Sequence, residues 1–187
     1  MFVVVTESRV GRHQQSAASG SYAAAAGIER LIADLRRLPG WQPVPSMSSA
    51  SADFNDGRAM PSLADGSSLD LARLTSDRQT ASDAFYPAGP NRPVWSLYAH
   101  ASIARLISGA PGGPDPYVVA WVADDPDETD GDPSRDSNGV ILVRAEAFGT
   151  RGAWRAIEAT LSADVVRDVA GVPIMSRVTV MTWREAR

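Results

Sequence analysis

The chain has 187 residues, of which 44% are apolar, and this is enough for one globular domain with a hydrophobic core. Its formal charge of -4 argues against nucleic acid as the main partner, because the phosphate backbone requires a basic surface. The absence of cysteine excludes disulfides, thiolate metal sites and a cysteine nucleophile.

The first forty residues predict one long helix, from Met1 to Leu38, with two unlike halves. Residues 6–21 are small or polar and form no apolar stripe. In the second half, apolar residues recur at steps of three and four, which places them on one helical face. These residues are Tyr22, Ala25, Ile28, Leu31, Ile32, Leu35 and Leu38. Pro39-Gly40 ends the helix, so we expect only its C-terminal half to pack on a domain.

A short apolar run, Phe2 to Val5, precedes the polar half of this helix. A bilayer requires about 20 apolar residues, so the run cannot cross a membrane by itself. We interpret it as the remnant of an N-terminal membrane helix. The expected organisation is a polar helical stalk over residues 1–21 and a globular domain over residues 22–187.

Residues 41–64 are irregular, and we expect Trp41 and Phe54 to pack back onto the domain. A short second helix begins after Asp65-Gly66, with Ser67 or Ser68 as its N-cap, and fades near Ser82. A second loop with three prolines follows, over residues 83–93.

From Val94 onward, β-branched and aromatic residues predict strands. The first strand begins at Val94, and its continuation over residues 101–107 is open between strand and helix. Glycine and proline form a loop at residues 109–116, and further strands cover residues 117–122, 140–148, 153–161 and 177–183. The four residues 149–152 are expected to form a hairpin loop that sets Glu146 opposite Arg155. Residues 163–173 are expected to be a long connection.

Helices followed by strands predict an α+β fold with an antiparallel sheet. In this fold the long N-terminal helix packs on one face of the sheet by its C-terminal half.

The most distinctive chemistry is an acidic loop, Asp124 to Gly139, which carries seven carboxylates and one arginine between two predicted strands. Oxygen ligands at alternate positions of a glycine-containing loop suit a calcium ion. The best candidate ligands are Asp125, Asp127, Asp130 and Asp132, followed by Asp136. The spacing does not match the EF-hand loop. The alternative interpretation is a solvated acidic turn, and zinc is not expected without cysteine.

Other residues carry weaker signals. Neither His13 nor His100 stands near a serine or an acid at a recognisable catalytic spacing, and no Gly-x-Ser-x-Gly motif is present. We therefore predict no catalytic residues and no enzymatic activity. The five tryptophans are spread along the chain, and most are expected in the core or half-buried on the sheet.

Several segments, in order along essentially the whole chain, resemble pilus assembly proteins of the PilX family, which are minor-pilin-like proteins of the type IV pilus system. The matching segments include Tyr22–Arg30 with Asp34-Leu35, Leu38–Trp41, Pro93–Tyr98, Tyr117–Pro126, Val140–Gly149 and Trp183–Glu185. No single segment is decisive, and the ordered set carries the resemblance.

The resemblance implies a pilin-like fold and a structural role in a type IV pilus or a related filament. It implies other pilins and minor pilins as partners. If the N-terminal membrane helix of the family precedes this sequence, it also implies the inner membrane, the periplasm and the pilus as locations. The membrane segment of the family falls upstream of Met1, so insertion and peptidase processing are not transferred to residues of this sequence.

Two alternatives from other classes stay open. One is a secreted or surface module that binds a glycan or a partner through exposed tryptophans and the acidic loop. The other is a small hydrolase, which requires a concave site that holds His100 with a carboxylate and a hydroxyl.

Overall fold

A computed structural model describes residues 2–47, 52, 54–86, 91–107, 116–167, 169–171 and 173–186; the side chains of residues 2–17, 151, 167 and 173–176 are outside this description. Helix α1 spans Phe2–Leu35 and α2 spans Leu71–Phe85. A short 3-10 turn, Val44–Ser46, and a four-residue helix α3, Ile103–Leu106, lie in the connections. Most of the predicted loop at residues 109–116 lies outside the described residues.

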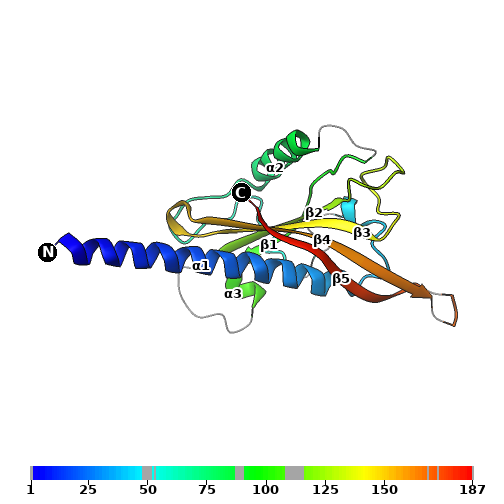
Figure 1. Cartoon of the computed structure of the whole chain (residues 1–187), viewed down its shortest axis with the longest axis horizontal. Coiled ribbons are helices and arrows are strands. Elements are labelled where there is room, and N and C mark those ends of the chain that lie inside the picture. The colour runs from blue at the N-terminus through cyan, green and yellow to red at the C-terminus, as the bar shows by residue number, and fades with distance from the viewer. Residues whose placement is uncertain are drawn as a thin grey trace.

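The body of the domain is a five-stranded antiparallel sheet with the strand order β1-β2-β3-β4-β5. Each strand pairs with the next one in the chain, so the sheet is a meander (Figure 1). The strands are β1 Ser96–Ser102, β2 Tyr117–Asp124, β3 Val140–Phe148, β4 Trp154–Arg167 and β5 Pro173–Ala186.

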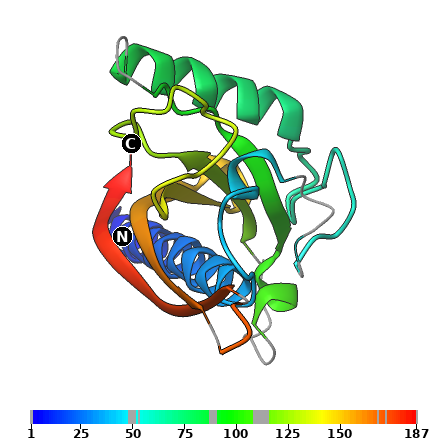
Figure 2. The same ribbon diagram turned by 90° about the vertical axis from the view of Figure 1, so that its right-hand side faces the viewer.

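Helices α1 and α2 lie on opposite faces of this sheet (Figure 2). Strand β2 shows why both faces need a cover, since all eight of its residues are buried. Its even-numbered residues Val118, Ala120 and Val122 belong to the core that contains α1. Its odd-numbered residues Val119, Trp121 and Ala123 join Leu71 in a second core beneath α2.

The expected pilin-like fold class, one long N-terminal helix packed by its C-terminal half on a sheet, is therefore wrong. The five-stranded antiparallel sheet dominates the domain, and it carries two shorter helical segments, residues 18–35 of α1 and the 15-residue α2. A single helix could not cover a sheet whose inner strand β2 is buried on both faces. The fold is still a mixture of helix and strand.

The apolar face predicted for the first helix is confirmed over its last turns. Ile28, Leu31 and Leu35 are fully buried in the core, whereas Tyr22 is 78% exposed. The helix ends at Leu35 rather than at Leu38. Trp41 and Phe54 pack back onto the domain as expected, each at 2% exposure.

The second helix begins and ends later than predicted. Its N-cap is Asp70, whose carboxylate accepts a hydrogen bond from the Arg73 N–H, rather than Ser67 or Ser68. It continues to Phe85, beyond Ser82.

Two predictions for the last strands are wrong. Glu146 pairs with Ala156 and not with Arg155, because the turn after β3 includes residues 149–153 and β4 begins at Trp154. Residues 163–173 are not a long connection, because β4 continues to Arg167 and β5 begins at Pro173.

Candidate metal centre

The acidic loop connects the end of β2 to the start of β3, so both of its ends are fixed by the sheet. Two glycines in this loop, Gly131 and Gly139, have positive φ angles of 73° and 79°. A Cβ on Gly139 would also lie 2.9 Å from the carbonyl oxygen of Ala163 on the neighbouring strand. Gly139 is therefore required both for the turn and for the close approach to β4.

Three of the five predicted ligands, Asp125, Asp132 and Asp136, accept hydrogen bonds that organise the turns of the loop. Asp125 accepts from the Asp127 N–H and, through its other oxygen, from the Asn138 amide. Asp132 accepts from the N–H and the hydroxyl of Ser134. Asp136 is buried and accepts from the N–H groups of Gly139 and Val140. The side chain of Asp127 is exposed.

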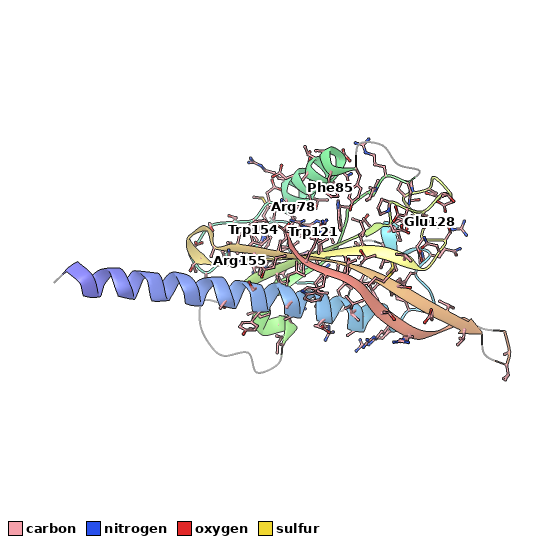
Figure 3. All side chains as sticks on the ribbon, viewed as in Figure 1. Arg78, Phe85, Trp121, Glu128, Trp154 and Arg155 are labelled. Carbon is pink, nitrogen blue, oxygen red and sulfur yellow. The ribbon has the colours of Figure 1, made fainter. Side chains whose placement is uncertain are left out.

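The structure brings a different set of carboxylates together: Asp124, Glu128 and Asp130, hereafter the acidic triad. One oxygen from each lies within 4.8 Å of the others. Asp130, the one predicted ligand in the triad, is exposed, whereas Asp124 is 0% and Glu128 4% exposed. Glu128 lies on the loop at the end of the sheet that is remote from the N-terminus (Figure 3).

The buried members of the triad use only part of their hydrogen-bonding capacity. Glu128 Oε1 accepts from the N–H and the hydroxyl of Ser137, but Oε2 is buried with no hydrogen-bond partner in the described part of the chain. Asp124 Oδ2 accepts from Asn91 Nδ2 at 2.6 Å, and Oδ1 is likewise buried without a partner among the described residues. Burying such oxygens is costly unless something compensates them.

The carboxylates of the triad repel one another, and the pKa values of the two buried members are raised. Burial, with the charge of Asp124 and then that of Asp130, raises the pKa of Glu128 to about 7. Burial also raises the pKa of Asp124 to about 6, against the hydrogen bond from Asn91. Within the described ranges, no arginine forms an ion pair with these three carboxylates. The triad can therefore hold either shared protons or a cation.

A second polar cluster involves His100, which is buried at 3% exposure. Its Nδ1 lies 2.8 Å from the Tyr117 hydroxyl, which donates to Asp56 Oδ2 at 2.8 Å. Burial lowers the pKa of His100, and the Asp56 carboxylate opposes this shift. The Asp56 N–H also donates to the His100 carbonyl oxygen, so the cluster fixes the segment around Asp56 to the edge strand β1.

The His100 cluster has the residue types that a hydrolase requires, but it does not line the pocket between α2 and β5. That pocket is lined by residues of another cluster, including Arg78, Arg144 and Arg184. The role that the contacts of His100 support is structural.

The tryptophans do not form an exposed set in the part of the chain that the structure describes. Trp41, Trp95 and Trp121 are buried, whereas Trp183 is 43% exposed. Trp154 is half-buried and donates from Nε1 to Glu146 Oε2. The prediction that most tryptophans lie in the core or on the sheet is confirmed.

Sequence reasoning missed a charged network between α2 and the sheet. Glu146 is fully buried and pairs with Arg78 Nε of α2 at 2.6 Å and with Arg144 Nε at 2.7 Å. Arg144 also reaches Glu158, which pairs with Arg184 of the edge strand. Figure 3 shows Arg78 and Trp154 between α2 and the sheet. The charged residues at alternate positions of β3, Arg144 and Glu146, were the available signal.

Comparisons with protein-family models, with curated proteins and with solved structures found no match. Among the described residues, no helix has the length and hydrophobicity that a membrane span requires.

Proposed function

We propose that this chain is a structural, non-enzymatic subunit of a type IV pilus or a related filament. The observation that carries the proposal is the path of α1. Its residues from Ala23 to Leu35 supply the core beneath the sheet, while its first turns extend beyond the end of the sheet (Figure 1).

A projecting helical segment needs an additional partner to be stable. Most helical stability in proteins comes from the packing of an amphipathic face rather than from helix propensity. Residues 6–21 are small or polar and lack an apolar stripe. We infer that residues 2–17 pack against helices of neighbouring subunits, with residues 22–187 as the globular domain.

The ordered resemblance to PilX-type proteins supports the same proposal, with other pilins and minor pilins as partners. The proposed locations are the inner membrane, the periplasm and the pilus. The alternative of a ligand-binding module that uses exposed tryptophans has less support, because three of the five side chains are buried.

Gene deletion in the source organism tests the filament role. We expect fewer surface filaments by electron microscopy. The intact gene should restore them, whereas a gene lacking codons 2–17 should not, although its domain still accumulates in cell extracts. Normal filaments in the deletion strain, or full restoration by the shortened gene, would contradict the proposal.

A further inference from the structure

We propose that the acidic triad is a calcium-ion site, with Asn91 holding Asp124 in position. This inference is independent of the filament role, because it depends only on side chains at one end of the sheet. Its ligands differ from the set expected from the spacing of the loop, and Asp130 alone is common to both.

Two side chains of the triad carry a buried oxygen without a hydrogen-bond partner among the described residues, and so does Asn91, which is hydrogen-bonded to Asp124. These buried oxygens are Asp124 Oδ1, Glu128 Oε2 and Asn91 Oδ1. Asn91 is 1% exposed, and its Nδ2 donates to Asp124 Oδ2 and to the Asp125 carbonyl oxygen. A cation in the triad would compensate the buried oxygens of Asp124 and Glu128.

The charges in the triad all have the same sign. Its three carboxylates lie within 4.8 Å of one another, and among the described residues no arginine forms an ion pair with them. A divalent cation between them would replace mutual repulsion by attraction. The surrounding chain is already fixed, because Ser137 holds Glu128, and Asn91 joins Asp124 to the segment before β1.

The chemistry of the ligands favours calcium over the other common cations. Carboxylate and amide oxygens are hard ligands, which suit calcium or magnesium rather than zinc. Two oxygens on one calcium ion lie at most about 4.6–5.2 Å apart, and on one magnesium ion at most about 4.0–4.2 Å. The oxygens of the triad lie within 4.8 Å of one another, close enough to share one calcium ion, whose coordination geometry is flexible, whereas magnesium demands a near-ideal octahedron.

Isothermal titration of the 187-residue chain with calcium chloride, after treatment with a chelator, tests the site. We expect one calcium ion per chain and a rise in Tm with calcium, because the ion binds only the folded state. The triad variant is Glu128→Gln, which keeps an oxygen for the hydrogen bonds from Ser137. It should weaken calcium binding by about tenfold or more.

Asp127→Asn is the matched control, because it removes one charge from the same loop at an exposed side chain that is outside the triad. It should change the affinity by a factor of about two. In the chelator alone, Glu128→Gln should melt at or above the wild-type temperature, since it relieves repulsion. If Glu128→Gln does not fold, Asp130→Asn at an exposed position replaces it, with the same expected loss of affinity.

Three results would overturn the proposal. The first is no heat and no Tm shift in the wild-type chain at millimolar calcium. The second is an equal loss of affinity in Asp127→Asn and Glu128→Gln, which would indicate diffuse attraction by the whole loop. The third is a magnesium affinity equal to that for calcium, which would contradict the choice of calcium over magnesium.

Discussion

Gly27 of α1 lies directly against Val118 of β2, and a Cβ atom on Gly27 would come within 2.6 Å of Val118 Cγ1 and 3.1 Å of Ala145 Cβ. The helix and the sheet approach this closely only because position 27 has no side chain. Ala23 and Ala24, which are also small and buried, extend the same close contact along the helix. The run of small residues in α1 is thus a packing surface.

The first prediction concerns this contact. Gly27→Ala should lower the free energy of unfolding by about 1 kcal/mol, since overpacking against a stiff valine outweighs the gain in helix propensity. Gly20→Ala is the control, because its nearest neighbour is the flexible Arg155 side chain, and it should be neutral or stabilising by up to about 1 kcal/mol. Chemical denaturation measures both, and equal stabilisation by the two changes would contradict the packing account.

The second prediction concerns the buried network under α2. Glu146→Gln leaves Arg78 and Arg144 without their shared carboxylate and should cost about 3 kcal/mol of unfolding free energy. Glu185→Gln, at an exposed position of the edge strand, should cost less than about 0.5 kcal/mol. A Glu146→Gln variant as stable as the control would show that the ion pairs contribute little.

The third prediction concerns pH and His100. Burial lowers the pKa of His100 in the folded state from its ordinary value of 6.5, so between the two values the unfolded chain binds more protons. This histidine therefore contributes stability that is lost as the pH falls through 6.5. The groups that face it are the Asp56 carboxylate and the Tyr117 hydroxyl.

Denaturation of wild type and His100→Gln at a series of pH values isolates the contribution of His100 to the pH dependence of stability, because the other titrating groups are common to both proteins. The wild type should lose stability relative to His100→Gln on acidification from about pH 7.5 to about pH 5. Parallel stability curves would contradict the assigned direction.

The fourth prediction concerns the turn that closes the acidic loop. Gly139→Ala must adopt a positive φ and also clashes with the Ala163 carbonyl oxygen, whereas Gly57→Ala meets only the positive φ in open space. Gly57→Ala should cost about 1–2 kcal/mol, and Gly139→Ala clearly more. Thermal melts compare the two variants. Similar losses of stability would show that the backbone of β4 at Ala163 moves to relieve the clash.

The part of the fold that the sequence predicts depends on local periodicity. The spacing of Ile28, Leu31 and Leu35 identified the buried face of α1, and all three lie in the core. The Glu146–Arg155 pair was wrong because the length of the turn after β3 shifts the register by one residue. The exposed Val165 and Val166 belong to a projecting part of β4 that had no buried face to mark it.

The candidate metal centre was only partly predictable. The acidic loop was evident, but its alternate-residue pattern pointed to aspartates such as Asp132, which caps a local turn. Asn91 meets Asp124 across 33 residues of sequence, a contact that only the tertiary fold creates. The two-residue period of β2 placed Asp124 in line with the buried Val122, and this was the signal available for it.

The measurement that tests the filament role most directly is site-specific cross-linking in living cells of the source organism. The chain has no cysteine, so one introduced cysteine is unique. Ser8→Cys places it in the projecting part of α1, and Ser76→Cys, the matched control, places it on the exposed side of α2.

We predict that Ser8→Cys is protected from a soluble maleimide and cross-links to filament subunits identified by mass spectrometry, while Ser76→Cys is labelled freely and does not cross-link to them. Free labelling of both cysteines, with no cross-link from position 8, would contradict the proposal that α1 packs into a filament.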